Sequence, residues 1–285
     1  MKHMIRFHKY HGLGNDFIII DNRQERIVFS KEAIKKICHR YFGIGADGIV
    51  FVQNSEKADI KMVIFNSDGS EAEMCGNASR CFAKYVYEKG ILQKTQINVE
   101  TLSGIIAPEI LLCDNKVLRV KVNMGKPIFD SKSIPCAIEG DLLVNRRINI
   151  ESSTYNITAI LMGVPHVVVF TKELEDNNVI KIGKLIEESS YFPQKTNVNF
   201  VDIINRNEII IRTWERGAGY TYACGTGACA SVVAGILKEL LNNKVLVHLR
   251  GGDLIVSWDG YGDVYMEGEA KEVFSGEFEP ELLTW

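Results

Sequence analysis

Apolar and polar residues alternate along most of the chain, and this pattern predicts many short strands separated by a few helices. In the first half, the predicted strands cover residues 5–10, 17–20, 49–52, 58–66, 95–101, 104–112 and 116–124. Ser30 is a suitable N-cap for a helix that runs to about Tyr41. A second helix is expected after residue 75 and ends at Gly90, and residues 11–16 are expected to form a loop.

The second half repeats this alternation. Its predicted strands cover residues 140–150, 154–162, 167–170, 198–204 and 208–213, and the tail adds strands at 245–249, 254–258, 264–269 and 272–278. A helix is expected near residues 178–189, and residues 163–166 are expected to form a turn. The helix predicted from Ala228 to about Leu241 is apolar on nearly all faces as far as Leu237, so we expect protein to surround it.

Composition is typical of a globular protein and excludes several classes of partner. The chain has 285 residues, 46% hydrophobic and 24% charged, which suits two domains. The net charge of −3 provides no basic excess for nucleic-acid binding. The segment Met1–His8 lacks the apolar core of a signal peptide, and the run Ala228 to Leu237 is too short to span a bilayer. We therefore expect a cytoplasmic protein with no membrane partner.

The seven cysteines do not have the pattern of a structural framework. Thiols stay reduced in the cytoplasm, so we do not expect disulfides. Their positions (38, 75, 81, 113, 136, 224 and 229) include no C-x-x-C pair, so no metal site is predicted. The glycine-rich run at 43–48 is also no dinucleotide site, because its third glycine comes one position early and a strand follows it.

One cysteine stands where a helix is expected to begin. Cys224 precedes Gly225-Thr226-Gly227, and the apolar helix pattern starts directly behind them. Backbone N–H groups at a helix start have no intrahelical partner, and the helix dipole there favours negative charge. A cysteine at this position can therefore have a lowered pKa, and the glycines let the backbone approach a bound anion. The stretch offers both a thiolate base and a carboxylate cradle.

A second copy of this arrangement lies in the first half. Cys75-Gly76 again precedes a predicted helix. A polar, glycine-containing run begins at Asn66, nine positions earlier (75 − 66), and another begins at Glu215, nine positions before Cys224 (224 − 215). The repetition predicts two similar halves. Two thiols on opposite faces of one carbon could remove a proton from one side and deliver one to the other, which is the chemistry of a cofactor-independent racemase or epimerase.

Simpler interpretations exist for each of these residues. A cysteine in a small-residue helix start is often only a packed residue, and we interpret Cys81 and Cys229 as core. His166 could be an active-site group in a turn or an ordinary core histidine. Glu215-Arg216 could be a surface ion pair, although Arg beside Gly-Ala-Gly more naturally holds a carboxylate. Four asparagines in predicted turns could bind an amino-acid zwitterion or serve only the backbone: Asn15, Asn66, Asn77 and Asn197.

Longer motifs that contain these residues resemble those of the diaminopimelate epimerases. The matching stretches are His11-Gly12-Leu13-Gly14-Asn15-Asp16-Phe17, Asn66-x-Asp68-Gly69-Ser70, Met74-Cys75-Gly76-Asn77 and Glu215-Arg216-Gly217-x-Gly219-x-Thr221-x-Ala223-Cys224-Gly225-Thr226-Gly227. The resemblance covers nearly the whole chain. It implies an α+β fold of two pseudo-symmetric domains, each a curved mixed β-sheet wrapped around a central helix, with the active site in the cleft between them. We expect domain boundaries at 1–124 and 125–271, with a returning strand at about 272–285.

The resemblance also implies roles for individual residues. Cys75 and Cys224 would be the acid–base pair, with roles exchanged between the two stereoisomers. Gly76, Asn77, Gly225 and Thr226 would hold the carboxylate and amine of the reacting centre. Substrate would also be bound by Asn15, Asn66, Asn197, Glu215 and Arg216, with Asn66, Asn197 and Arg216 at its distal end. Neither a metal nor pyridoxal phosphate would be needed, the partner would be a small amino-acid substrate, and a homodimer is one option.

Two positions depart from the family pattern. The family usually has Gly-Asn-Pro-His where this chain has Gly163-Val164-Pro165-His166, so Val164 removes a polar contact from the distal end of the substrate site. Ala78 stands where the family usually has glycine. Three hypotheses remain open at this stage: a diaminopimelate epimerase, a related enzyme acting on another amino acid such as histidine or lanthionine, and a thiol-bearing binding protein without catalysis.

Overall fold

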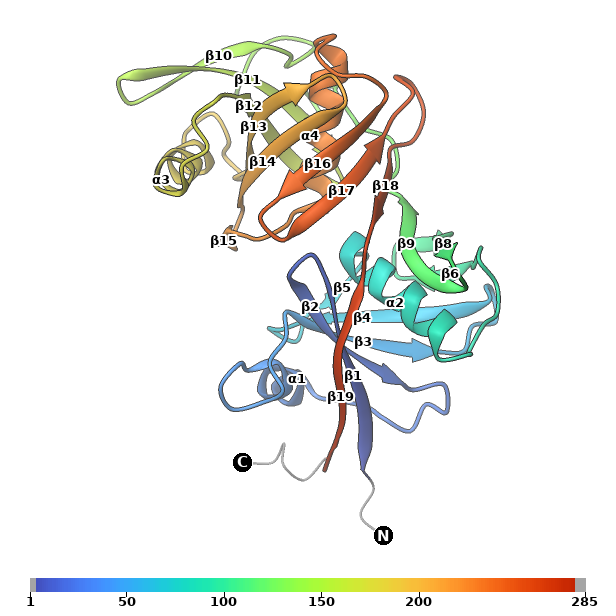
Figure 1. Ribbon diagram of the computed structural model, residues 1–285. Helices are drawn as coiled ribbons and strands as arrows, with labels where there is room; N and C mark the ends of the chain where they lie inside the picture. Colours follow the sequence, from blue (N-terminus) through green and yellow to red (C-terminus); the bar gives the residue numbers. More distant parts are fainter. Residues whose placement is uncertain (1–3, 280–285) are drawn as a thin grey trace. The chain divides into compact units, whose positions relative to one another are not determined.

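A computed structural model describes residues 4–279 and divides the chain into two compact units. Unit 1 comprises Met1–Val122 and Gly268–Trp285, and unit 2 comprises Asn123–Glu267 (Figure 1). The divisions fall two residues before the expected first boundary and four residues before the expected second one. The expected returning strand beyond residue 279 lies outside the described residues.

Unit 1 contains one mixed sheet, two helices and an antiparallel hairpin. The sheet has the strand order β19-β1-β2-β3-β4-β6-β7, with β5 paired to β4. Its elements are β1 (Ile5–Gly12), β2 (Asn15–Asp21), α1 (Lys31–Cys38), β3 (Gly48–Gln53), β4 (Ile60–Asn66), β5 (Glu71–Ala72), α2 (Gly76–Glu88), β6 (Val99–Thr101), β7 (Gly104–Ile106) and β19 (Lys271–Phe278). The antiparallel hairpin consists of β8 (Glu109–Cys113) and β9 (Lys116–Asn123).

Unit 2 is also a mixed sheet with two helices. Its strand order is β10-β11-β12-β13-β14-β16-β17-β18, with β15 paired to β14. The elements are β10 (Arg146–Ile150), β11 (Ser153–Met162), β12 (Val164–Phe170), α3 (Asp176–Glu187), β13 (Asn197–Asn205), β14 (Glu208–Glu215), β15 (Gly219–Tyr220), α4 (Gly225–Leu237), β16 (Lys244–Leu249), β17 (Gly252–Ser257) and β18 (Tyr265–Gly268).

The two units repeat one topology element by element. In unit 1 the pairs β2–β3 and β4–β6 are parallel, and in unit 2 the pairs β12–β13 and β14–β16 are parallel. The intervening pairs, β3–β4 and β13–β14, are antiparallel. Adding ten to a strand number in unit 1, from β1 to β7, gives its counterpart in unit 2, and α1 and α2 correspond to α3 and α4. The predicted pseudo-symmetric α+β fold is therefore confirmed.

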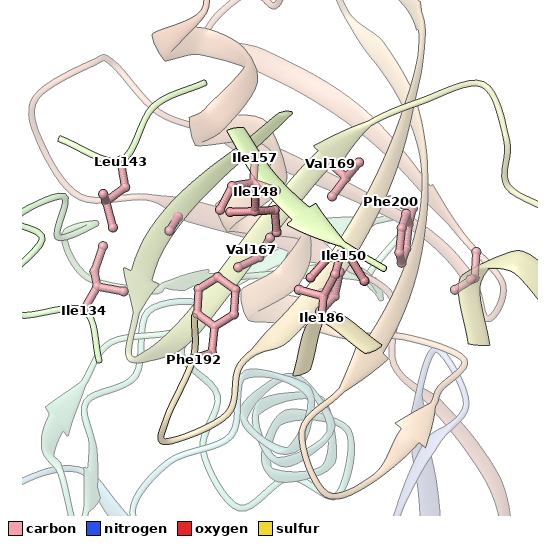
Figure 2. Close-up of a cluster of buried hydrophobic side chains, with 13 residues drawn as sticks. Ile134, Leu143, Ile148, Ile150, Ile157, Val167, Val169, Ile186, Phe192 and Phe200 are labelled. Carbon is pink, nitrogen blue, oxygen red and sulfur yellow. The ribbon is translucent and has the colours of Figure 1, made fainter. Parts of the chain in front are cut away.

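Each sheet is buried on both faces. In unit 2, Figure 2 shows side chains from β10 to β13 converging with Ile186 and Phe192, which come from α3 and the segment behind it. Val167 and Val169 belong to this cluster, so Val168 and His166 point to the opposite face, because side chains alternate along a strand. That face packs against α4. In unit 1 the corresponding cluster lies under α1 and includes Ile34, Ile37 and Phe51.

The two helices that follow the Cys-Gly pairs are the most enclosed elements. Residues 227–235 of α4 are all buried, as the apolar pattern predicted. In α2 the buried run is 77–83, and it includes the guanidinium-bearing Arg80, which is fully inaccessible. Cys81 and Cys229 lie inside these helices with no exposed surface, so their interpretation as core residues is confirmed.

Three sequence-based boundaries are wrong for identifiable reasons. The expected loop at 11–16 is only the turn Leu13-Gly14, because both residues adopt positive φ (59° and 91°) and let β1 and β2 pair up to Gly12 and Asn15. The expected turn at 163–166 is likewise only Gly163, at φ 73°, so Val164, Pro165 and His166 belong to β12. The helix expected from Ala228 starts at Gly225 and ends at Leu237.

The first helix also ends earlier than expected. It stops at Cys38 instead of Tyr41, because the chain folds back over its end: Gly45 and Ala46 donate backbone hydrogen bonds to the carbonyls of Ile37 and Cys38, both 3.0 Å. A side chain at Gly43 would clash with the carbonyl of Lys36, so the tight return requires glycine there. This fold-back fixes the start of β3. Between residues 4 and 279, none of the helices has the length and apolar character needed to cross a membrane.

Ser30 caps α1 as predicted, since its Oγ accepts the N–H of Ala33 at 3.1 Å. We predict that Ser30→Ala lowers the free energy of unfolding by about 1 kcal/mol, because one N–H of the first turn then lacks its acceptor. Ser30→Asp should preserve stability, since its carboxylate can cap and suits the helix dipole. Urea unfolding of the three proteins checks this; equal midpoints for wild type and Ser30→Ala would contradict it.

Candidate functional site

The predicted site residues form two groups, one in each unit. Cys75 is the N-cap of α2, with φ −144° and ψ 118°, and Cys224 is the N-cap of α4, with φ −124° and ψ 109°. The two cysteines thus share the extended backbone of an N-cap and occupy equivalent places in the repeated topology. Gly76 and Gly225 are the first residues of their helices, where the N–H groups are free of intrahelical partners.

In unit 1 a row of amides joins Cys75 to the sheet. The Sγ of Cys75 lies 3.9 Å from Oδ1 of Asn15, near the long limit of an S–H···O contact. The same oxygen accepts a hydrogen bond from Nδ2 of Asn77 at 3.0 Å. The side chain of Asn77 in turn accepts from the buried Arg80 at 2.9 Å. Asn15, Cys75 and Asn77 therefore form one connected group at the start of α2.

Asn66 takes part in a separate structure of unit 1. It is the last residue of β4, and its Nδ2 donates to Oγ of Ser70 at 3.0 Å. The backbone N–H of Asn66 also donates to the carbonyl of Ser70. Gly69, at φ 81°, closes this turn. The side chain of Asn66 is exposed and belongs to this turn.

In unit 2 the surroundings of Cys224 favour the protonated thiol. Burial and the negative charge of nearby Glu215 raise the pKa of Cys224 well above its usual value. Contacts with the hydroxyl of Thr226 (3.5 Å) and the N–H of Gly227 (3.4 Å) act in the opposite direction but do not prevail. The sequence predicted that a helix start would lower this pKa, and that expectation is wrong for the structure as it stands. Desolvation outweighs the helix N-terminus.

Glu215 and Arg216 are each held by hydrogen bonds within unit 2. A carboxylate oxygen of Glu215 accepts from the hydroxyl of Thr221 at 2.6 Å. The guanidinium of Arg216 donates to the carbonyl of Gln194 at 3.0 Å, and its backbone N–H donates to Oδ1 of Asn197 at 2.9 Å. These contacts do not include the Glu215–Arg216 ion pair that the simpler interpretation proposed. The Arg216 head group is held beside the start of β13.

Asn197 links two segments of unit 2. Its Nδ2 donates to the carbonyl of Pro165 at 3.0 Å, while its Oδ1 accepts from Arg216. The residue is nearly inaccessible. Each end of the amide therefore already has one protein partner, which leaves one N–H and one lone pair for a ligand.

His166 is fully buried on the α4 face of the sheet. Its Nδ1 lies 3.2 Å from Nδ2 of Asn199, which can only donate, so the neutral ring carries its proton on Nε2. That Nε2 has no hydrogen-bond partner among the described residues. Burial, reinforced by the charge of Arg216, lowers the pKa of His166 to about 3. The imidazole is therefore neutral and holds an unused donor.

Equivalent positions of the two units carry different chemistry. Asn15 is the first residue of β2, and Val164 is the first residue of β12. The repeated topology makes them counterparts, so the amide beside Cys75 has an aliphatic side chain as its counterpart in the unit of Cys224. Likewise Asn77 and Thr226 both stand two positions after their cysteines. The backbone is repeated, but the polar groups around the two thiols are not.

Four residues of these networks were not singled out from the sequence. Asp47 accepts from Nδ2 of Asn15, Arg80 supports Asn77, Thr221 holds Glu215, and Asn199 contacts His166. The i,i+3 spacing of Asn77 and Arg80 on one helix was a usable signal, as was the presence of Thr221 in the Glu215 motif. The sequence contains no such signal for Asn199 and Asp47, because their contacts depend on which strands pair. Among residues 4–279 no cluster of three or more His, Cys, Asp or Glu side chains could hold a metal ion.

Comparison with known proteins identifies the family. The sequence profile described as "Diaminopimelate epimerase" matches residues 7–129 and 158–273, which contain both cysteine motifs. The chain belongs to the diaminopimelate epimerase family. The stretch between the two matched parts, residues 130–157, contains β10 and the segment that leads to it.

Relatives within the diaminopimelate epimerase family match over almost their full length. A protein of Caldanaerobacter subterraneus subsp. tengcongensis named diaminopimelate epimerase is 49% identical over 275 residues, covering 96% of this chain and 100% of that protein. Proteins of the same name from Desulfitobacterium hafniense and Methanococcus maripaludis are 46% and 45% identical and cover 94% and 96% of this chain, with 96% and 100% of their own lengths. The match thus extends across both units.

Solved structures with lower identity share the fold. A hydroxyproline epimerase from Agrobacterium vitis, solved with bound trans-4-hydroxy-L-proline, superposes with a TM-score of 0.70 at 15% identity, covering 97% of this chain and 93% of that one. A PhzF-family phenazine biosynthesis protein from Bacillus anthracis has a TM-score of 0.68 at 18% identity, with coverage of 97% and 99%. At these identities the likeness establishes the two-unit fold and nothing more.

The buried His166 predicts a pH dependence of stability. The unfolded chain takes up a proton near pH 6.5, whereas the folded protein does so only near pH 3. The stability contributed by the neutral ring is therefore present above pH 6.5 and is lost as the pH falls towards 3, by up to about 1.4 kcal/mol per pH unit. We predict that His166→Gln flattens this slope in urea unfolding between pH 7 and 4.5. His39→Gln, at an exposed histidine, is the control; identical slopes in all three proteins would contradict the prediction.

Proposed function

We propose that the chain is an isomerase that interconverts LL- and meso-diaminopimelate without a cofactor, in the synthesis of lysine and peptidoglycan precursors. Membership of the family supports this substrate. The observation that carries the chemistry is the pair of equivalent N-cap cysteines, each at the start of a buried helix. No other cysteines among the described residues stand at helix starts.

In this proposal the two thiols act on one α-carbon. One cysteine, as thiolate, takes the α-proton and becomes a thiol, while the electron pair of the C–H bond remains on the carbon. The other thiol then donates its proton to the opposite face and becomes a thiolate. For the reverse stereochemistry the roles exchange. The high pKa of Cys224 suits it to be the proton donor in the state described here.

The helix starts also suit the charge that develops. N–H groups at Gly76, Asn77, Gly225 and Thr226 lie in the first turns of α2 and α4, where negative charge is stabilised. We assign these four residues to the carboxylate and amine of the reacting centre, with the N–H groups on the carboxylate. Asn15 and Glu215 contribute polar contacts near the thiols. Asn66, Asn197 and Arg216 are assigned to the distal amino-acid end, where the Arg216 guanidinium can bind a carboxylate through two N–H groups.

An alternative substrate is favoured by one observation. Val164, at the first position of β12, is half-buried and cannot donate or accept a hydrogen bond. A distal amino-acid group therefore has one polar partner fewer than the usual family pattern provides. The same two-thiol chemistry on another amino acid, such as histidine or lanthionine, is the second candidate function.

Location and assembly form a separate part of the proposal. Seven free thiols suit a reducing cytoplasm. We further propose a homodimer, because β19 is the edge strand of the unit 1 sheet, with β1 as its one neighbour among residues 4–279. It exposes Val273 (57%) and Phe274 (46%). An exposed edge strand of this kind can pair with a second copy.

The two-thiol mechanism predicts that both cysteines are required. Cys75→Ala and Cys224→Ala should each lower the rate of diaminopimelate epimerisation by roughly 10²–10⁴-fold or more, since a positioned acid–base group is lost. In deuterated water the wild type should incorporate deuterium at the inverted centre, detected by mass spectrometry. Cys81→Ala and Cys229→Ala, at buried helical thiols, are the matched controls and should keep the chemistry. Full activity of either N-cap variant would refute the mechanism.

Val164 offers a test of the substrate. The measurement is kcat/KM for LL-diaminopimelate, lanthionine and histidine with wild type and Val164→Asn. If diaminopimelate is the native substrate, the wild type should have its highest kcat/KM with it. In Val164→Asn this kcat/KM should either change little or rise by up to about 10–150-fold, which is the contribution of one hydrogen bond to a charged group. A wild type that turns over histidine far faster, with the order reversed in Val164→Asn, would favour the second candidate function.

A further inference from the structure

The amides next to Cys75 lie in a hydrogen-bonded row with an opposite charge at each end. At one end the carboxylate of Asp47 accepts from Nδ2 of Asn15 at 2.7 Å. Oδ1 of Asn15 then accepts from Nδ2 of Asn77 at 3.0 Å. At the other end Oδ1 of Asn77 accepts from Arg80 at 2.9 Å. The row contains three hydrogen bonds that all run in the same direction.

The two end groups determine which way each amide faces. A carboxylate only accepts hydrogen bonds, and a guanidinium only donates them. Asp47 therefore requires the NH₂ of Asn15, and Arg80 requires the carbonyl of Asn77. Either amide flipped alone would set two oxygens or two NH₂ groups against each other, and both flipped together would oppose both end groups. One orientation satisfies every partner.

The orientation of the Asn15 amide determines which of its atoms faces the sulfur of Cys75. Because the NH₂ of Asn15 is turned to Asp47, its carbonyl oxygen is the atom 3.9 Å from the sulfur. A carbonyl oxygen can accept from a thiol but repels a thiolate. The flipped amide would instead offer a donor, which favours the thiolate. The direction of the row therefore bears on the protonation state of the proposed acid–base group.

Asp47 is itself held firmly by charged neighbours. Its other carboxylate oxygen accepts from Arg40 at 2.6 Å, and Arg40 also pairs with Asp16 at 2.9 Å. Asp16 forms a further ion pair with the largely buried Lys9 at 2.7 Å. The amine of Lys9 donates to the carbonyl of Gly45, in the segment that folds back over α1. The carboxylate thus has a fixed place relative to Asn15.

The second unit has no counterpart to this row. The residue before β13 that corresponds to Asp47 is Thr196, whose hydroxyl donates to the carbonyl of Asn197. Val164 occupies the position of Asn15, and Cys229 that of Arg80, five positions after its N-cap cysteine. The arrangement is therefore specific to the surroundings of Cys75 and is not a requirement of the repeated fold.

We propose that Asp47 is a positioning residue that, together with Arg80, orients the amide of Asn15 so that its carbonyl oxygen faces Cys75. Asp47 acts through Asn15, whose amide contacts both Asp47 and the sulfur of Cys75. Its importance for turnover rests on the proposed function of Cys75, but its effect on the thiol does not. The two can therefore be tested separately.

The test measures the rate at which iodoacetamide alkylates Cys75 at neutral pH without substrate, by peptide mapping. Asp47→Asn removes the carboxylate that can only accept, so the orientation of Asn15 is then held by Asn77 and Arg80 alone. The flipped amide, with its NH₂ at the sulfur, is therefore populated more often than in the wild type. We expect alkylation of Cys75 to accelerate about three- to tenfold, because a donor now stabilises the thiolate. Asp47→Ser, a smaller neutral replacement, should act in the same direction and covers the case in which Asp47→Asn does not fold.

A double-mutant cycle distinguishes positioning from general loosening of the structure. In an Asn15→Ala background, Asp47→Asn should have no further effect on the alkylation rate, because its effect passes through the missing amide. Arg23→Met is the matched control: it removes an ion pair with Asp21 at the other end of β2 and leaves the row unchanged, so the rate should stay at the wild-type value.

Two results would overturn the proposal. One is an unchanged alkylation rate in folded Asp47→Asn and Asp47→Ser. The other is an equal acceleration with and without the Asn15 side chain. Epimerisation assays of the same variants are interpreted separately from the alkylation rates. If the wild type does not epimerise any amino acid while the alkylation cycle gives the expected coupling, the proposed function fails and the positioning role stands.

Discussion

The need to satisfy the first-turn N–H groups of two buried helices constrains the rest of this structure. Residues 227–235 of α4 and 77–83 of α2 have almost no contact with solvent, so water is a poor partner for the groups at their starts. In α4 the sulfur of Cys224 accepts the N–H of Gly227, which makes the thiol part of the helix cap. A side chain at Gly227 would clash with Asn199, so the helix start is pressed against β13. The buried start of α4 needs an acceptor for its N–H group, and this need places the thiol of Cys224 at the helix start.

The same burial explains why the two thiols differ in a repeated fold. Duplicated topology gives both cysteines an N-cap backbone, but protonation depends on the groups within a few ångströms. Cys224 is desolvated and lies near the charge of Glu215, whose position is fixed by Thr221. Cys75 is less buried and faces the carbonyl of Asn15. For the proposed acid–base pair, such unequal surroundings favour different protonation states at the two cysteines, whereas identical sites would favour the same one.

Much of the fold and part of the site were predictable from sequence, and the failures share a cause. Most strands, the Ser30 cap and the enclosed character of α4 depend on local patterns and were predicted correctly. The strand expected at 104–112 is instead two strands, β7 and β8, and the one expected at 140–150 begins only at Arg146. The repeated Cys-Gly pairs revealed the duplication because equal spacing reflects equal topology. The turns at 11–16 and 163–166 were predicted too long, because one or two residues at positive φ suffice to reverse the chain. Local composition indicates that a turn exists but does not fix its length.

Interactions that cross the sheet were beyond sequence reasoning. The pKa of Cys224 was expected to fall because only the helix start is visible in the sequence, whereas desolvation depends on the strands packed around it. Asp47 and Asn15 are 32 residues apart and meet because β2 and β3 are parallel neighbours. Asn199 reaches His166 across the parallel pair β12–β13 in the same way. In both units the parallel pair therefore brings together polar side chains that are distant in the sequence, and the identity of these side chains differs between the two halves.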